Sequence, residues 1–360
     1  MGILPKCFGF TDSKHTISAA TANKTSTSTP IEELRHRFSF AQLRKITGNF
    51  HKSRIIGTLP ICDVYRACID IQGTVREIAI KKFRYNSDQL LAEFKNEIQI
   101  LCQLRHPNLV SLIGFYKDES RIISVYEYTP NGSLYYHLRS KVTEPLFWKR
   151  RLQICIGVAR GLHYLHAGVK RTIFHRDVQL MNILLDENFV PKLANFKYCL
   201  TGPHAMSKPK PKNLDMVVGS FGYIAPECYR DFIFTDKCDV YSFGMVLLVV
   251  LCAMEPSAIY KKMGEMEEQD VNDVENELFE GSHSFAKQLC SFLQKGMAYV
   301  IIDPFLIGKI APQCWKMFMD IAEKCLLEDA SERPTMGEVE LELEHALALQ
   351  EEAEAFNPDK

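Results

Sequence analysis

Five polar residues in separate short segments have the types and spacing to do chemistry together. Asp177 supplies a carboxylate that can accept a proton, and Asn182 follows five residues later with a neutral amide. Asn195 adds a second amide thirteen residues further on. Lys81 and Glu97 offer a cation and an anion of the kind that pair beside a charged ligand. Since hard dications prefer charged oxygen to neutral amides, neither amide would be a strong ligand for such an ion.

The surrounding sequence predicts the elements that must hold these residues. Alternating apolar residues predict short β-strands between residues 55 and 83, with Lys81 at the end of an apolar run. Residues 88–104 carry apolar side chains at spacings of three and four, which predicts an amphipathic helix. Two more strands follow at residues 109–116 and 122–127, and the chain then turns predominantly helical. This order predicts an α+β protein with a small sheet lobe and a larger helical lobe.

Composition bounds the class of protein. The 360 residues suffice for two structural units, and 46% apolar with 24% charged residues is ordinary for a globular protein. A net charge of −1 gives no reason to expect nucleic-acid binding. The twelve cysteines lack metal-site spacing and no secretory signal precedes them, which favours reduced thiols. The longest apolar run, residues 243–254, is too short to span a bilayer and predicts a buried helix.

The N-terminal segment is predicted to be disordered and leaves its membrane association open. Residues 1–30 are rich in Thr, Ser and Ala without periodicity. Gly2 and Cys7 could carry myristate and palmitate, which together suffice for peripheral anchoring. Lys6 stands where the myristoylation pattern has Ser or Thr, so an unmodified start is the alternative.

Several longer segments carry a family resemblance. They are residues 38–43 (FSFAQL), 106–114 (HPNLVSLIG), 175–182 (HRDVQLMN), 225–227 (APE), 239–244 (DVYSFG) and 322–326 (AEKCL). Together they resemble plant receptor-like kinases, in particular FERONIA-type malectin-like receptor kinases and related receptor-like cytoplasmic kinases. The resemblance implies a bilobal fold in which a five-stranded antiparallel sheet with one main helix joins a larger helical lobe. It implies these parts: a helical lead-in at 31–52, an N-lobe at 53–129, a C-lobe at 130–346 and a tail at 347–360.

The resemblance also implies roles for the residues that match family motifs. Asp177 would accept the substrate hydroxyl proton, and Lys81 would contact the ATP phosphates while paired with Glu97. Asn182 would ligate a metal, with Asn195 as a weak second ligand. The nucleotide-binding set implied is Gly57, Val64, Ala79, Lys81, Glu127, Thr129 and Asn182, with the adenine edge at the backbone of Glu127 and Thr129.

Other matches imply structural roles. His175 and Phe196 are expected to stack within an apolar column with Leu101 and Leu112, which keeps the active shape with or without catalysis. Arg333 is the expected partner of Glu227 in a buried ion pair, which is structural and gives no indication of activity.

Four departures from the family pattern weigh against catalysis. Residues 57–62 (GTLPIC) replace a glycine-rich phosphate loop: two glycines are lost, and Pro60 has no N–H to donate. The other three departures are Gln179 for a lysine that neutralises the transferring phosphate, Asn195 for the metal-binding aspartate, and Lys197 for the adjacent glycine. Phosphoryl transfer depends on positioning and charge, and losing one stabilising group costs about 10²–10³ in rate.

Two functional hypotheses follow. The favoured one is a catalytically impaired, pseudokinase-like adaptor in cell-surface or immune signalling, at the cytoplasmic face of the plasma membrane. Its expected partners are other signalling proteins, such as receptor kinases or immune receptors, and no nucleic acid. The alternative is an active ATP-dependent protein Ser/Thr kinase, supported by Lys81, Glu97, Asp177 and Asn182. ATP and magnesium are the implied cofactors, and the departures weigh against magnesium.

Overall fold

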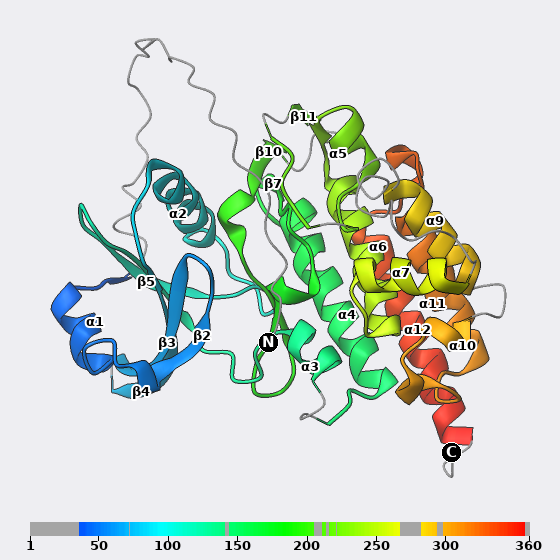
Figure 1. The fold of residues 1–360 in the computed structure, drawn as a ribbon, viewed down its shortest axis with the longest axis horizontal. Helices are drawn as coiled ribbons and strands as arrows, with labels where there is room; N and C mark the ends of the chain where they lie inside the picture. The colour runs from blue at the N-terminus through cyan, green and yellow to red at the C-terminus, as the bar shows by residue number, and fades with distance from the viewer. Residues whose placement is uncertain are drawn as a thin grey trace.

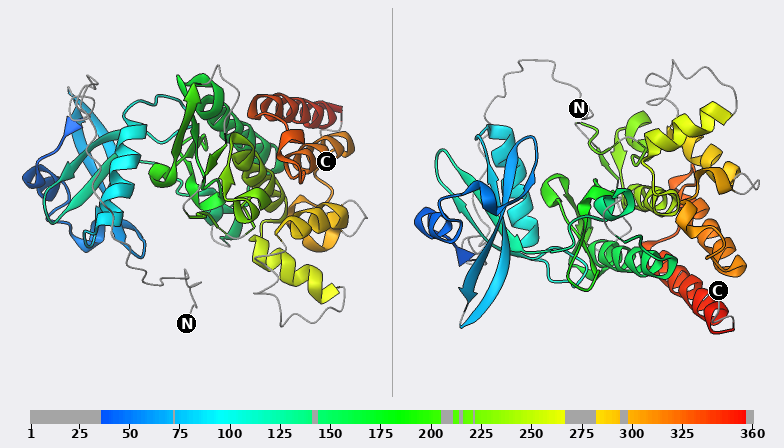
Figure 2. Two further views of the ribbon diagram at one scale, coloured as in Figure 1. Left: turned by 90° about the horizontal axis from the view of Figure 1, so that it is seen from above. Right: turned by 60° about the horizontal axis from the view of Figure 1, so that its bottom comes forward.

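The computed structural model describes residues 36–71, 73–140, 144–204, 211–213, 216–220, 222–266, 282–293 and 298–356. The predicted disordered segment 1–30, with Gly2 and Cys7, lies outside these residues. A sheet lobe, blue to cyan in Figure 1, lies beside a helical lobe, green to red. Two further views keep the two lobes side by side (Figure 2).

The sheet lobe contains the five antiparallel strands that the family resemblance implies. They are β2 (Ile55–Thr58), β3 (Cys62–Ile71), β4 (Thr74–Phe83), β5 (Leu112–Lys117) and β6 (Ile122–Glu127). Their order in the sheet is β5-β6-β4-β3-β2. A sixth strand, β1 (His36–Arg37), extends the sheet by pairing in parallel with β5. The sequence gives no signal for β1, because two residues are too few to show an alternating pattern.

Alternation along the strands gives this sheet two different faces. Tyr65, Ile78, Ile80 and Val125 point to the outer face and form a separate buried cluster with Leu43. Leu43 belongs to α1 (Phe40–Ile46), which begins at a Ser39 capping box and covers this face. The opposite face is therefore the one that looks toward the helical lobe.

The helix α2 (Asp88–Leu101) packs on that inner face. Ser87 caps its first turn by accepting the Leu90 N–H. Phe94, Ile98 and Leu101 are buried along one side of the helix, which confirms the amphipathic pattern, although the helix ends three residues before the predicted residue 104. Glu97 is buried on the same helix, so this carboxylate needs polar partners inside the protein.

The helical lobe is built around α6 (Asp236–Cys252), which is almost wholly buried because it is apolar on all sides. Thr235 caps its N-terminus. The helices that surround it are α3 (Leu134–Arg139), α4 (Trp148–His163), α5 (Pro226–Arg230), α7 (Pro256–Met266), α9 (Ser282–Phe292), α10 (Ala298–Ile301), α11 (Pro312–Cys325) and α12 (Met336–Phe356). Among the described residues no single helix is long and apolar enough to cross a membrane; α6 and α7 pass that test only together, with a 62° bend between them.

Short elements complete the two lobes. Three two-stranded sheets pair β7 (Arg171–Phe174) with β10 (Leu200–His204), β8 (Ile183–Leu185) with β9 (Pro191–Leu193), and β11 (Lys212–Asn213) with β12 (Ile233–Phe234). One-turn helices are η2 (Lys52–Arg54), η3 (Tyr164–Gly168), η4 (Leu180–Asn182), η5 (Phe196–Tyr198), η8 (Pro304–Leu306) and η9 (Ala330–Glu332). The loop that carries Asp177 runs from β7 to η4, and η5 follows β9. The start of η5 lies beside the Asp177 loop, because Asn195 donates a hydrogen bond to Asp177.

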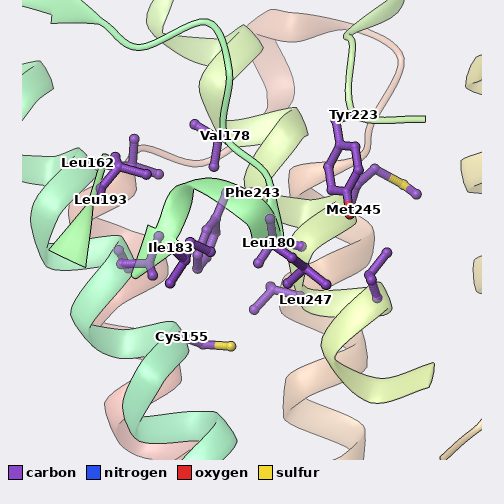
Figure 3. Close-up of a cluster of buried hydrophobic side chains, with 14 of the residues drawn as sticks. Cys155, Leu162, Val178, Leu180, Ile183, Leu193, Tyr223, Phe243, Met245 and Leu247 are labelled. Atoms are coloured by element: carbon purple, nitrogen blue, oxygen red, sulfur yellow. The ribbon is translucent and has the colours of Figure 1, made fainter. Parts of the chain in front are cut away.

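Two buried features fix this region to the core. Figure 3 shows Val178, Leu180 and Ile183 gathered around Phe243 of α6, and all four are buried in one apolar cluster. Arg333, fully buried, donates to both carboxylate oxygens of the Glu227 side chain. This ion pair confirms the expectation from the family resemblance.

Candidate active site

A buried carboxylate on α6 holds the loop that carries Asp177. The Asp239 side chain accepts the backbone N–H groups of His175 and Arg176 at 2.8 and 2.9 Å. It also lies 2.9 Å from Nε2 of His166. Arg176 adopts a left-handed backbone with φ of 70°, which is uncommon for a residue other than glycine. The hydrogen bonds to Asp239 stabilise this turn and direct Asp177 toward the inter-lobe boundary.

Three side-chain amides surround the Asp177 carboxylate. Gln179 Nε2 donates to Asp177 Oδ1 at 2.6 Å, while Nδ2 of Asn182 and of Asn195 donate to Oδ2 at 2.8 Å each. Asn182 Nδ2 also donates to the Asp177 carbonyl at 2.7 Å. A carboxylate only accepts hydrogen bonds, so the NH₂ end of each amide must face it. Three of the roughly four acceptor positions on a carboxylate are therefore filled from within the chain.

His175 occupies a buried place behind Asp177. Its Nδ1 accepts the Asp177 N–H at 3.3 Å, so Nε2 carries the proton and donates to the Ala194 carbonyl at 3.0 Å. Burial lowers the pKa of His175, although Asp239 and Asp177 oppose that shift. The imidazole stacks edge-on against Phe196, with ring centroids 5.1 Å apart. Phe196 shares its buried cluster with Leu101 and Leu112, as the family resemblance implies.

The predicted cation and anion meet across the sheet and α2. Lys81 Nζ lies 4.0 Å from Glu97 Oε2, with the side chains 18% and 3% exposed. Glu97 Oε1 also accepts the Phe196 N–H at 3.3 Å. Tyr126 lies close by, and its pKa is raised well above its usual value by burial and by the Glu97 charge. These contacts place Lys81 on the inner face, so the pair that would orient a phosphate contact is assembled.

A second set of contacts joins α2 to η5. Asn96 Nδ2 donates to the carbonyls of Lys197 and Cys199 at 3.0 and 2.9 Å. Lys197 Nζ lies 3.5 Å from Glu93 Oε2 and 4.4 Å from the centre of the Tyr198 ring. Burial acts to lower the pKa of Lys197, but the Tyr198 hydroxyl and Glu93 outweigh it and raise the pKa. We call these contacts of Glu93, Asn96 and Lys197 the α2–η5 clamp.

The backbone at Lys197 does not require glycine. Lys197 lies in the one-turn helix η5 and is absent from the described residues with positive φ, whereas Asn195 has φ of 72°. The backbone freedom of a glycine is therefore not needed at residue 197 in this conformation. Lysine fits because α2 offers Glu93 one helical turn before Glu97.

The predicted adenine-binding residues lie along one side of the inner sheet face. In the strand register, Val64 pairs with Lys81 and Ala79 pairs with Tyr126, so these side chains share a face. Glu127 ends β6, and its carboxylate lies 2.9 Å from Lys192 Nζ in β9. Its own N–H donates to Ser111 O at 3.0 Å.

Thr129 and Gly57 occupy the two ends of this region. The Thr129 carbonyl accepts the Gly132 N–H at 3.1 Å, which turns the chain into the helical lobe. Gly57 in β2 pairs with Val64, and a Cβ placed there would lie 3.9 Å from the Val64 Cβ. No close contact within the protein therefore requires glycine at position 57.

The loop between β2 and β3 is tied down by its own chain. The Leu59 N–H donates to the Cys62 carbonyl at 2.9 Å, and Pro60 has no N–H. Arg84 donates to the Pro60 carbonyl at 3.1 Å and to Asp63 Oδ1 at 2.6 Å, and its N–H donates to Ile61 O. A phosphate-binding loop presents free backbone N–H groups to its ligand, so this loop has few donors to offer.

Cys62 is fully buried at the start of β3 rather than at the loop tip. Burial raises the pKa of its thiol against the opposing charges of Lys81 and Lys197. Within the part of the chain that the structure describes, cysteines 62–325 form no disulfide, and no cluster of three His, Cys, Asp or Glu side chains could hold a metal.

Comparison with known proteins identifies the family. A family model described as protein tyrosine and serine/threonine kinase matches residues 50–301. The chain belongs to this kinase family. Its sequence is 42% identical over 346 residues to the receptor-like protein kinase FERONIA of Arabidopsis thaliana, covering 94% of this chain and 36% of that protein. It is similarly 44% identical to ANXUR2 over 344 residues (95% and 37%) and 41% identical to THESEUS 1 over 350 residues (96% and 38%), both from the same plant.

These relatives confirm a protein kinase domain of the plant receptor-like kinase type, as the sequence motifs predicted. The chain spans little more than a third of the length of the curated relatives it matches. In this kinase domain the predicted catalytic residues Lys81, Glu97 and Asp177 lie at the boundary between the lobes. Their roles, and those of the nucleotide-binding set, stay predictions.

The kinase fold implies ATP with magnesium, and the residues present do not fit the metal. The two residues placed to ligate it, Asn182 and Asn195, are neutral and point their NH₂ groups at Asp177. Asp177 Oδ2 already accepts both of them. Magnesium prefers near-octahedral coordination with carboxylates and phosphates, and the two residues placed to ligate it offer only neutral amide oxygens.

Several residues at the site were missed by sequence reasoning. Glu93 could have been found, because it lies four residues before Glu97 and thus on the same helical face. Asp239 and Arg84 act through contacts across 63 and 21 residues, and Asn96 reaches residues 101 and 103 positions away. Such long-range partners have no periodic signal in the sequence.

Proposed function

We propose that this chain is a catalytically impaired kinase domain of the plant receptor-like kinase type that acts as an adaptor in cell-surface or immune signalling. Its partners are other signalling proteins, receptor kinases or immune receptors among them. It acts in the cytoplasm, at the inner face of the plasma membrane, and Gly2 and Cys7 would supply the anchor. The net charge of −1 gives nucleic acid no reason to bind.

The observation that carries the proposal is the set of three side-chain amides that donate hydrogen bonds to the Asp177 carboxylate. A general base must reach the proton that it accepts, and Gln179, Asn182 and Asn195 leave about one acceptor position on this carboxylate. Gln179 also brings no charge to the transferring phosphate. Each lost stabilising group costs about 10²–10³ in rate in other enzymes, so the combined loss supports very slow transfer.

The scaffold part of the proposal rests on contacts that assemble the two lobes without a ligand. Lys81 and Glu97 are paired, and the α2–η5 clamp fixes α2 by an ion pair and two hydrogen bonds. A shape held by the chain itself is suited to partner recognition, because it does not depend on nucleotide to form.

The second candidate function is an active Ser/Thr kinase. It is favoured by the intact Lys81–Glu97 pair and by the remaining acceptor position on Asp177 Oδ1. In that case the Gln179 amide would have to move aside as the substrate hydroxyl arrives.

A phosphotransfer assay separates the two. Purified protein is incubated with radiolabelled ATP, a generic protein substrate and either Mg²⁺ or Mn²⁺, beside an Asp177→Ala variant. The expected result is labelling no greater than that of the variant. Robust labelling that disappears in Asp177→Ala refutes the impaired-kinase proposal and establishes the second candidate.

A further inference from the structure

The charge around Asp177 differs from the family pattern in a definite direction. Asn195 removes one negative charge, Lys197 adds one positive charge, and Gln179 removes one positive charge, so the site is more positive by one unit overall. The Lys197 ammonium pairs with Glu93 on α2, with Nζ 3.5 Å from Glu93 Oε2. The change at Asn195 removes the negative charge that would attract a dication to this position.

The parts of the site that bind the base and the first phosphates of a nucleotide are retained independently of the metal. Val64 and Ala79 share the inner face with Lys81, and Lys81 is held beside Glu97. Backbone contacts at Glu127 and Thr129 do not depend on side-chain identity. The metal-binding part offers no carboxylate instead, because both candidate ligands, Asn182 and Asn195, are neutral amides whose NH₂ groups donate to Asp177.

We propose that this cleft binds adenine nucleotides without a divalent cation, with Lys81 as the protein cation that the phosphates meet. The inference deepens the proposed function and rests on it, because both depend on the amides that donate to Asp177. Because the metal has no charged ligand on the protein, adding it brings no net gain in affinity. The adenine nucleotide should therefore bind equally tightly when a chelator removes the magnesium.

The structure supplies a variant that should convert the site. Asn195 has a left-handed backbone, which aspartate tolerates nearly as well as asparagine. Asn195→Asp replaces a donated hydrogen bond by a second carboxylate facing Asp177 at the 2.8 Å contact. Two like charges at that distance repel, and a dication between them relieves the repulsion. The variant should therefore gain a requirement for magnesium that the natural chain lacks.

Asn188→Asp is the matched control. Asn188 is exposed in the turn before β9, so this variant makes the same charge change away from the cleft. Lys81→Met tests whether binding occurs at the cleft, because it removes the paired cation and should weaken binding to the same degree with or without the metal.

The experiment measures ATP affinity by calorimetry for the full chain in excess EDTA and in millimolar Mg²⁺. The natural chain and Asn188→Asp should bind with affinities that agree within about twofold between the two conditions, whereas Asn195→Asp should bind at least about tenfold more tightly with Mg²⁺. Magnesium enhancement of about tenfold in the natural chain overturns the inference, as does failure to bind ATP in either condition. Neither result touches the transfer assay, so the inference can fail while the proposed function stands.

Discussion

Within the α2–η5 clamp, Asn96 supplies two of the hydrogen bonds that join α2 to the helical lobe. Asn96→Ala removes two neutral hydrogen bonds, to the carbonyls of Lys197 and Cys199 at 3.0 and 2.9 Å. At about 0.5–1.5 kcal/mol each, their loss should lower the free energy of local opening by about 1–3 kcal/mol. The same two hydrogen bonds are also broken on global unfolding, so the free energy of unfolding should fall by a similar amount.

Hydrogen–deuterium exchange of the α2 and η5 amides measures this opening directly. A loss of about 1–3 kcal/mol speeds exchange about 5- to 150-fold, and the Phe196 N–H, which donates to Glu97, should report it. Gln99→Ala, an exposed change on the same helix, is the matched control and should leave exchange unaltered. Unchanged exchange at Phe196 and along α2 in Asn96→Ala would show that the clamp does not hold the lobes.

Three further predictions address activity and stability. Asn195→Asp with Lys197→Gly and Gln179→Lys should partly restore metal-dependent transfer in the radiolabel assay; a flat result would identify the tied-down loop at residues 59–62 as the dominant defect. Glu227→Ala should lower the free energy of unfolding by about 3–5 kcal/mol in urea titrations, because it leaves the fully buried Arg333 unpaired. Burial acts to raise the Glu227 pKa, but the hydrogen bonds and charge of Arg333 outweigh burial and lower it. The pair therefore contributes its full stability above the unfolded pKa of about 4.3, and this contribution is lost as pH falls through the folded pKa. An equal loss of stability at acid pH in Glu227→Ala would contradict this assignment. Since burial lowers the pKa of His175, the unfolded chain binds its proton more readily, and stability should decline as pH falls below about 6.5; His175→Phe should remove that part of the slope.

The fold could be predicted from the sequence wherever a periodic pattern or a capping residue was present. Ser39 marks the start of α1 and the apolar spacing marks α2, and both helices begin where those signals place them. The apolar run at residues 243–254 begins inside the buried α6 and ends two residues after it. The end of α2 and the two-residue β1 could not be predicted, because the first depends on packing against the sheet and the second on pairing with β5.

The composition of the site could be predicted, but its hydrogen bonding could not. The family resemblance identified Lys81, Glu97 and Asp177, and it treated Asn195 as a lost charge and a weak metal ligand. The structure shows that its amide instead donates to Asp177. Likewise, Lys197 was treated only as a lost glycine, and the structure shows that it pairs with Glu93 on α2. In both cases the partner lies far away in the sequence, so only the folded chain reveals what the substitution does.

Anomalous diffraction from crystals grown with Mn²⁺ and a non-hydrolysable ATP analogue tests most directly whether Asp177 and its amides exclude the metal. We expect no manganese peak between Asn182 and Asn195, with both amides still directed at the Asp177 carboxylate. Two fully coordinated ions at that place, beside a γ-phosphate aligned for transfer, would contradict the impaired-kinase proposal.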